Sequence, residues 1–254
     1  MRYFESLEES IHEIARDLYK APMVISTRVQ NVRSDQLVRE AMGYAYTISG
    51  GIPDSIDELI LLAKKSPEYF PQWEDKGWCE KVKIWALLER DARCFGRLQD
   101  PAPDSFHPEL GKHIEGSHFS YVYGERLLHA PELVALSLVR DRYTRRAYWP
   151  IFTPQDAVRA YSLTRIPCSL GYQVLVRSVP GPHGTPQDFL HLFYLQRSCD
   201  FSKYWLTDVW MARQFQKSVL ELVNQEVRDE IHLGSFTHFI ISFHRFLLPG
   251  EEDY

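Results

Sequence analysis

The last third of the chain most constrains its fold, because two strand-like segments, a long helix and a third strand-like segment follow one another there. Residues 170–177 and 190–195 are predicted to be strands, and the stretch 179–187 between them contains three prolines and two glycines. Such a stretch is typical of a hairpin loop rather than a domain linker. Residues 209–227 are predicted to form a helix, and the β-branched and aromatic residues of 236–247 predict a strand. This order of elements indicates an α+β fold.

The rest of the chain adds further helices and strands to this pattern. Apolar residues at helical spacing predict helices at 5–20, 35–45, 75–97 and 131–142, and another helix that begins at an Asp54 or Ser55 cap. Strands are expected at 24–32 and 146–152, and a long loop at 99–116. With 254 residues, 44% of them hydrophobic, the chain can bury one large core. We therefore predict a single α+β domain over residues 1–254, with a mixed or antiparallel sheet flanked by helices.

Charge and composition narrow the classes of function. The net charge is −5 and the pI is about 6.1, which argues against a general nucleic-acid binder but allows a small anionic ligand held by local arginines. No apolar run approaches the roughly 18 residues of a membrane span, and the N-terminus lacks the layout of a signal peptide. The four cysteines form no Cys-x-x-Cys pair, so we expect no metal site and a reducing, cytoplasmic environment.

Two short segments contain residues that could perform chemistry: Pro167-Cys168, at the head of a predicted strand, and Gln-Arg-Ser-Cys-Asp at residues 196–200. A thiolate is a strong nucleophile, but a nearby cation or dipole has to stabilise it at neutral pH. Arg145-Arg146 and Arg197 are candidate phosphate ligands, because a guanidinium group binds phosphate oxygens bidentately. A single cysteine is more often core filler, and an arginine pair is more often solvated surface. Their combination favours a nucleotide site.

Six segments, taken in chain order, resemble motifs of the thymidylate synthase superfamily. The most specific is residues 196–200, which matches the family's Gln-Arg-Ser-Cys-Asp in full. The others are Tyr121–Gly124, Thr144–Arg146, Ile166–Cys168, Gly234–Phe236 and, ten residues after Gly234, His244–Phe246. The resemblance implies a thymidylate-synthase-like domain, a homodimer that forms through the sheet face, and 5,10-methylenetetrahydrofolate as the carbon donor without a metal.

The same resemblance implies catalytic roles for three residues. Cys168 would add to carbon 6 of a pyrimidine nucleotide and make carbon 5 nucleophilic, and Tyr123 would help to remove the carbon 5 proton. Glu40 lies where the family has its general acid/base glutamate, although the flanking Leu-Leu-Trp is missing. Ser169 departs from the pattern, since the family has a histidine after the nucleophile.

The resemblance also implies the ligands of the substrates. The 5′-phosphate would be held by Arg197 and Ser198, by Arg145 and Arg146 from a second subunit, and by an earlier arginine that is either Arg28 or Arg33. The charge of Arg197 would also favour the thiolate. Asp200 would contact the pterin of the folate, and His244 would reach the sugar. The remaining histidines show no metal-ligand spacing, and we expect them on loops or strand surfaces: His183, His191, His232 and His238.

Asp208 predicts which base is read. The family's uracil-specific enzymes have an asparagine eleven residues after the arginine of the Gln-Arg-Ser motif, and eleven residues after Arg197 this chain has Asp208. Cytosine presents a ring-nitrogen acceptor and an amino donor, and a carboxyl group complements both when it is protonated or bridged by water. The aspartate therefore resembles that of the (deoxy)cytidylate 5-hydroxymethyltransferases. The alternative interpretation is that Asp208 is a helix N-cap before Val209, and the two roles are compatible.

The end of the sequence bears on the product. Hydride addition to the carbon unit gives a methyl group, and water addition gives a hydroxymethyl group. The sequence ends eight residues after Phe246, without the family's long C-terminal extension, so we expect a less sealed site and hydroxymethyl transfer to CMP or dCMP. Phe246 replaces a tyrosine that contacts the sugar, and the sequence does not choose between ribose and deoxyribose. The alternatives are a methylase of dUMP or dCMP and a non-catalytic nucleotide-binding homolog.

Overall fold

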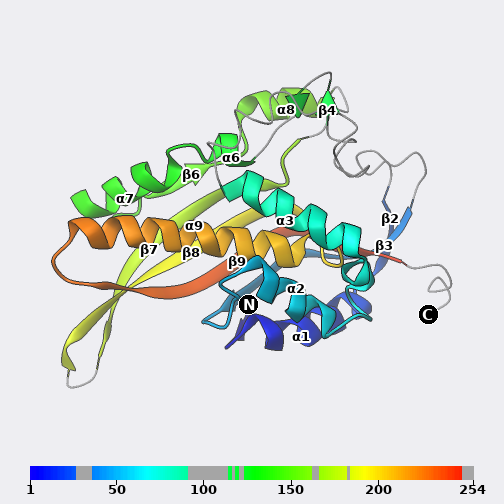
Figure 1. The fold of residues 1–254 in the computed structure, drawn as a ribbon, viewed down its shortest axis with the longest axis horizontal. Helices are drawn as coiled ribbons and strands as arrows, with labels where there is room; N and C mark the ends of the chain where they lie inside the picture. The colour runs from blue at the N-terminus through cyan, green and yellow to red at the C-terminus, as the bar shows by residue number, and fades with distance from the viewer. Residues whose placement is uncertain are drawn as a thin grey trace.

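The predicted α+β class is confirmed by the structure, a computed structural model that describes residues 1–26, 36–90, 114–115, 118–119, 123–161, 166–181 and 184–247. Within these residues one mixed sheet of seven strands has helices packed against it (Figure 1). The strand order is β1-β3-β9-β8-β7-β6, and β2 pairs with β3. The strands of the sheet are β1 (Arg2–Phe4), β2 (Met23–Ser26), β3 (Gln36–Ile48), β6 (Tyr148–Pro150), β7 (Ser169–Pro180), β8 (Pro186–Asp200) and β9 (Ile231–Phe246). A separate ribbon consists of β4 (Ile114–Glu115) and β5 (His118–Phe119).

Side-chain caps mark the starts of two of the helices. The helices are α1 (Leu7–Lys20), α2 (Ile56–Lys64), the 3-10 turn η1 (Pro71–Glu74), α3 (Lys76–Arg90), α6 (Tyr123–Arg126), α7 (Ala130–Arg140), α8 (Pro154–Tyr161) and α9 (Trp205–Glu226). At the start of α1, the Ser6 side chain accepts a hydrogen bond from the Glu9 amide. A reciprocal capping box between Ser55 and Glu58 starts α2, as the predicted cap required.

The predicted hairpin and final strand are confirmed, and α9 explains how they combine. Strands β7 and β8 pair antiparallel from the Ser169–Gln196 pair to the Pro180–Pro186 pair. Strand β9 then lies parallel to β8. Parallel neighbours need a crossover connection, and α9 provides it across one face of the sheet (Figure 1). The sheet is therefore mixed rather than purely antiparallel.

The helix predicted at residues 35–45 is wrong, because residues 36–45 belong to β3. Their apolar positions have an approximately helical spacing, and local spacing alone favoured a helix. In the structure β3 pairs antiparallel with β9 from Val38–Phe246 to Ile48–Phe236. This long ladder satisfies the backbone and buries Tyr46 and Ile48, so tertiary pairing overrides the local preference. Part of the predicted strand at 24–32 and most of the predicted loop at 99–116 lie outside the described residues.

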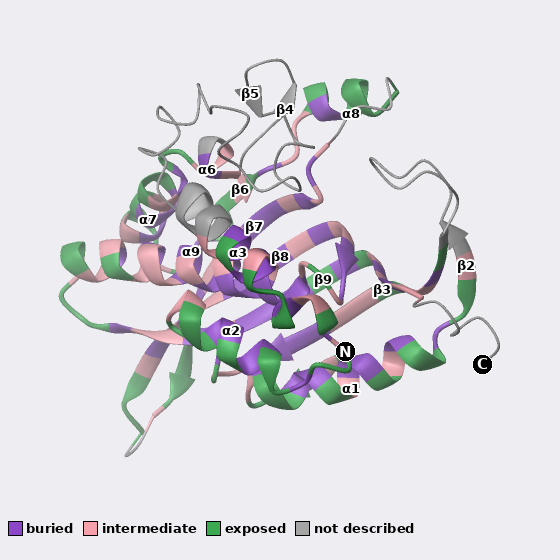
Figure 2. Ribbon diagram, turned by 45° about the vertical axis from the view of Figure 1, so that its right-hand side comes forward, coloured by how far each residue is buried: buried purple, intermediate pink, exposed green. Residues whose placement is uncertain are grey.

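The core lies between the sheet and α9. Along β8 every second residue from Leu190 through Tyr194 is buried, and Figure 2 shows the alternation of buried and intermediate segments along the central strands. Trp205 makes ring contacts with Tyr46 and Phe243, and all three belong to the same buried core. This packing fixes the start of α9 against the end of β8, where the functional motifs lie. In the part of the chain that is described, no helix has the length and apolar character that crossing a bilayer requires.

Candidate active site

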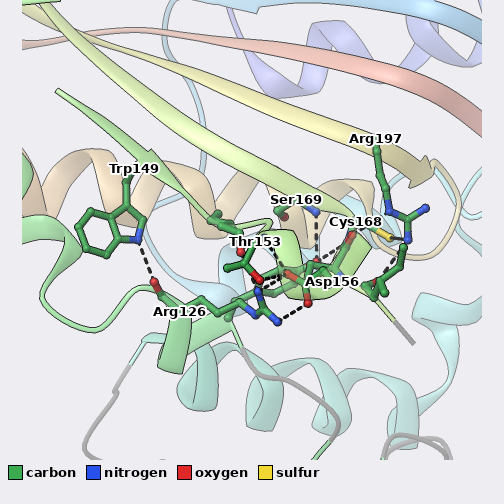
Figure 3. Close-up of polar contacts among 11 residues, drawn as sticks. Arg126, Trp149, Thr153, Asp156, Cys168, Ser169 and Arg197 are labelled. Carbon is green, nitrogen blue, oxygen red and sulfur yellow. Dashed lines mark hydrogen bonds and ion pairs between the residues drawn. The ribbon is translucent and has the colours of Figure 1, made fainter. Parts of the chain in front are cut away.

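Cys168 immediately precedes the first residue of β7. Arg197 of β8 makes several polar contacts with Cys168 and with the two residues before it. The backbone amide of Arg197 donates to the carbonyl of Cys168 at 2.8 Å. Its side chain donates from Nε to the Pro167 carbonyl at 2.8 Å and from Nη2 to the Ile166 carbonyl at 3.2 Å. The same Nη2 lies 3.7 Å from the Cys168 sulfur (Figure 3). A guanidinium held this close to a thiol favours its thiolate form.

Tyr123 contacts the same turn from the opposite side. Its hydroxyl oxygen accepts hydrogen bonds from the Cys168 amide at 3.0 Å and from the Ser169 amide at 3.4 Å. Ser169, where the resemblance led us to expect a histidine, shares a 2.5 Å hydrogen bond with the hydroxyl of Tyr194. Two tyrosine hydroxyls thus hold the backbone amides of Cys168 and Ser169 and the side chain of Ser169.

A buried ion pair that the sequence analysis missed anchors the helix that carries Tyr123. Arg126, at the end of α6, donates to both carboxylate oxygens of Asp156 at 2.6 and 2.7 Å, and the amide and hydroxyl of Thr153 donate to the same carboxylate at 2.8 Å (Figure 3). Burial acts to raise the pKa of Asp156, but the hydrogen bonds from Arg126 and Thr153 outweigh it and lower the pKa. The Arg126 carbonyl accepts from the Trp149 indole at 2.8 Å. No sequence motif marked this pair, because its members are thirty residues apart.

Asp208 lies in the first turn of α9, and its carboxyl group faces the end of β8. The helix begins at Trp205 with Tyr204 as its N-cap, so the interpretation of Asp208 as an N-cap is wrong. Gln196 Nε2 donates to Asp208 Oδ2 at 2.7 Å, and the Cys199 thiol lies 3.7 Å from the same oxygen. Burial raises the pKa of Asp208 to about 7, against the opposing effect of these two hydrogen bonds. Both protonation states are therefore accessible near neutral pH.

Tyr123, Ser169 and Asp208 all line one pocket. It has a volume of about 700 Å³, including its open mouth, and extends along α9 between α7 and β7. Its aromatic and polar lining also includes Tyr172, Tyr194, Trp210, Gln214, Phe215 and Ser218. A planar ring fits such a lining, and the hydroxyl and carboxyl groups can orient it.

Three other predicted residues form a row across neighbouring strands. Asp200 on β8 is opposite His244 on β9, which in turn is opposite Glu40 on β3. Asp200 is buried, which raises the pKa of its carboxyl, while His244 and Lys203 oppose that effect. The carboxylate of Glu40 accepts a hydrogen bond from the Ser242 hydroxyl. Ser198 lies opposite Ser242 at the same end of the sheet.

The structure does not bring every predicted residue to the thiol. Glu40 on β3 is three strand spacings away from β7, or about 14 Å, which is too far for direct proton transfer at the Cys168 side. Arg145 and Arg146 are exposed and just precede Ala147, whose carbonyl accepts from the Val174 amide. Val174 is six residues along β7 from Cys168, so the arginine pair is about 20 Å from the sulfur within one chain. Arg28 and Arg33 lie outside the described residues.

The histidine prediction needs one correction. His238 does not lie on a surface, because it is fully buried beneath α9 and its ring stacks on Tyr194 at 4.5 Å between centroids. His191 is half-buried and shares a 2.9 Å hydrogen bond with Ser235, while His183 is outside the described residues. Over the described ranges, the histidine, cysteine and acidic side chains form no group of three or more suited to a metal ion.

Comparisons with known proteins agree with this architecture. No family model matches the sequence, and no curated protein is significantly similar to it. Among solved structures, the chain is similar to the thermostable thymidylate synthase A from Bacillus subtilis, with a TM-score of 0.58 and 14% sequence identity. The similarity covers 94% of this chain and 79% of that chain. The protein therefore has a thymidylate synthase-like fold, as its sequence motifs predicted.

Proposed function

We propose that this protein transfers a one-carbon unit to carbon 5 of a pyrimidine nucleotide, and that its substrate is CMP or dCMP. The observation that carries the proposal is that Tyr123, Ser169 and Asp208 line one pocket, while Cys168 contacts Tyr123 and lies beside Arg197. A nucleophile, a cation that favours its thiolate and a group that can read a base edge are thereby combined. The likeness to a thymidylate synthase fold supports the reaction class.

The nucleophile would be the thiolate of Cys168, which adds to carbon 6 of the base so that carbon 5 becomes nucleophilic. Tyr123 holds the backbone of this cysteine and would assist removal of the carbon 5 proton. Arg197 has already committed Nε and Nη2 to the turn around Cys168. Its Nη1 remains for the nucleotide phosphate, with Ser198 as a neighbouring donor.

Asp208 would select cytosine over uracil. The neutral carboxyl group offers one donor and one acceptor, which match the ring nitrogen and amino group of cytosine. Because the pKa of Asp208 is raised to about 7, this neutral form is well populated at neutral pH. A mismatched base would leave a buried polar atom unpaired, at a cost of about 1–3 kcal/mol.

The carbon donor that this reaction implies is 5,10-methylenetetrahydrofolate, which would supply the one-carbon unit when bound. The described residues fit such a ligand, because Tyr172, Trp210 and Phe215 present aromatic surface to the pocket. Asp200 accepts from the Ser202 and Lys203 amides through Oδ1, which leaves Oδ2 for the amino-substituted pterin. We propose hydroxymethyl rather than methyl transfer, since the hydroxyls of Ser169 and Ser218 can hold water in the pocket.

A homodimer through the sheet is part of the proposal. The face of the sheet away from α9 presents Met42, Phe239 and Ile241 with 84%, 41% and 59% of their surfaces exposed. Large exposed apolar groups on one face are typical of a protein interface. Such a dimer would also give Arg145 and Arg146, remote from Cys168 in their own chain, a partner's phosphate to bind.

Product analysis tests the proposal. Purified protein is incubated with 5,10-methylenetetrahydrofolate and, separately, CMP, dCMP, UMP or dUMP, and each product is read by mass spectrometry. We expect a gain of CH₂O on one or both cytidylates and no product with Cys168→Ser. Cys79→Ser is the matched control, because Cys79 is a buried thiol that donates to the Trp73 carbonyl, outside the pocket lining. A methyl gain on dUMP would refute the assignment of Asp208.

A second candidate, a nucleotide-binding homolog without turnover, is favoured by one observation. Glu40, the predicted general acid/base, lies about 14 Å from the strand that follows the thiol. If parent and Cys168→Ser proteins bound cytidylate equally and neither formed product, this candidate would replace the enzyme.

A further inference from the structure

A chain of hydrogen bonds leads from Asp208 into the core. Gln196 Nε2 bonds Asp208 Oδ2 at 2.7 Å, and Gln196 Oε1 lies 2.9 Å from His238 Nε2. The other ring nitrogen, His238 Nδ1, lies 2.8 Å from the hydroxyl of Tyr46, and this hydroxyl also lies 2.7 Å from the indole nitrogen of Trp205. Gln196, His238, Tyr46 and Trp205, here called the relay, come from β8, β9, β3 and α9 and are all buried.

The chemistry of the relay fixes the direction of every bond. An indole nitrogen only donates, so the Tyr46 oxygen accepts from Trp205. Among the hydrogen bonds of the described residues, His238 Nδ1 is the group that can accept the Tyr46 proton, and a buried hydroxyl without an acceptor is unfavourable, so Nδ1 acts as acceptor. Burial lowers the pKa of His238 to about 3, so the ring is neutral and its one proton is on Nε2. His238 therefore donates to Gln196 Oε1, and the Gln196 amide must present its NH₂ group to Asp208.

This direction distinguishes the two oxygens of Asp208. Oδ2 accepts from Gln196 and from the Cys199 thiol, so it is the acceptor oxygen of the carboxyl group. A proton that neutralises the group then belongs on Oδ1. If the Gln196 amide were reversed, its carbonyl would demand a proton from Oδ2, and Oδ1 would become an acceptor.

We propose that the relay consists of positioning residues that put the proton of neutral Asp208 on Oδ1 and thereby present a hydrogen-bond donor to the ring nitrogen of cytosine. The inference rests on the proposed function, in which Asp208 reads the base. It adds Gln196, His238, Tyr46 and Trp205 as residues that act through Asp208 without touching the base. The reversed relay would offer an acceptor where uracil has its ring N–H.

Two other ionisable residues act directly on Asp208, and one of them, Cys199, favours the same direction through a weak thiol donor. Cys199 donates to the same oxygen, and Asp200 acts on Asp208 through its negative charge. The phenols of Tyr46 and Tyr194 are also within electrostatic range, and burial raises the pKa of each well above its usual value, so both remain neutral. The hydrogen bond from Gln196 differs from these effects, because the contact of Gln196 Oε1 with His238 fixes which atom of the amide faces Asp208.

The first test needs neither substrate nor turnover. Protein with ¹⁵N-labelled histidine is studied by long-range ¹H–¹⁵N NMR between pH 5.5 and 8.5, and His238→Gln identifies the signal. We expect His238 to remain a neutral Nε2–H tautomer across the range. An Nδ1–H tautomer or an imidazolium would overturn the proposed direction of the relay.

The second test measures base selectivity by calorimetric binding of CMP and UMP at pH 7. In Tyr46→Phe, His238 loses the donor that fixes its tautomer, and we expect the CMP-to-UMP affinity ratio to fall by about five- to tenfold. Thr47→Val is the matched control: Thr47 shares a buried 2.9 Å hydroxyl–hydroxyl bond with Thr237 on the same strand pair, outside the relay. An unchanged ratio in Tyr46→Phe would overturn the proposal.

The two tests separate failure of the inference from failure of the proposed function. If the parent protein bound neither nucleotide, the function would fail while the NMR result still decided the tautomer. If Tyr46→Phe did not fold, Gln196→Leu would test the same step. That variant removes a donor from the Asp208 carboxylate, so we expect the pH midpoint of CMP binding to rise by about one unit. A midpoint that did not move would contradict a role for the relay.

Discussion

Substitution of Asp156 by asparagine tests whether the buried ion pair with Arg126 supports the site. Asp156 is 1% exposed and accepts two hydrogen bonds from Arg126 and two from Thr153. Removing one partner of a buried pair costs about 3–5 kcal/mol, because the remaining charge is left uncompensated. Asparagine retains one acceptor oxygen, so we expect a loss of about 3 kcal/mol in the free energy of unfolding.

The lowered pKa of Asp156 predicts how its contribution to stability changes with pH. The pKa of Asp156 is lowered in the folded protein, so its contribution is fully present above the unfolded pKa of about 3.9 and is lost as the pH falls through the folded value. The difference between parent and Asp156→Asn should therefore be large at pH 7 and shrink in acid. Urea unfolding monitored by tryptophan fluorescence at several pH values measures both quantities.

Asp141→Asn is the matched control, because Asp141 is exposed at the end of α7 and should change stability by less than about 0.5 kcal/mol. The ion pair anchors α6, which carries Tyr123, so Asp156→Asn should also lower turnover relative to this control. A loss below about 1 kcal/mol at pH 7, or an equal loss in acid, would refute the reasoning.

Three further predictions follow from other parts of the structure. Because burial raises the pKa of Asp208 to about 7, CMP affinity should fall as the pH rises from 6 to 8. A CMP affinity that does not change over this pH range, measured by calorimetry, would contradict this prediction. If the proposed dimer forms through the sheet, Ile241→Asp should convert it to monomers in analytical ultracentrifugation, while Tyr161→Asp, 91% exposed on α8, should not. Gly171→Ala puts a Cβ 2.7 Å from a backbone carbonyl of β6 and should cost about 1–3 kcal/mol in thermal unfolding, more than Gly50→Ala, whose nearest atom is 3.6 Å away.

The sequence correctly predicted the elements whose local residue pattern agrees with the structure that the rest of the chain imposes. The β7–β8 hairpin, α9 and β9 were all expected, since turn residues, helical spacing and β-branched composition point in the same direction there. Strand β3 was not predicted, because the spacing of its apolar residues is close to that of a helix. Pairing with β9, which the local sequence does not reveal, makes this segment a strand. Residues distant in sequence decide such a segment, and local propensity is too weak to oppose them.

The candidate site divides in the same way. The sequence by itself determined the chemical groups: Cys168 and Arg197 in recognisable motifs, and the carboxyl of Asp208 at a fixed spacing from that arginine. Only the tertiary structure placed Arg197 beside the thiol, paired Arg126 with Asp156, and buried His238 behind Asp208. The type of a residue is set locally, but burial and hydrogen-bond direction depend on strands and helices that meet only in the folded chain. For that reason the sequence named the group that we propose to read the base, whereas the fold set its raised pKa and selected the oxygen that accepts from Gln196.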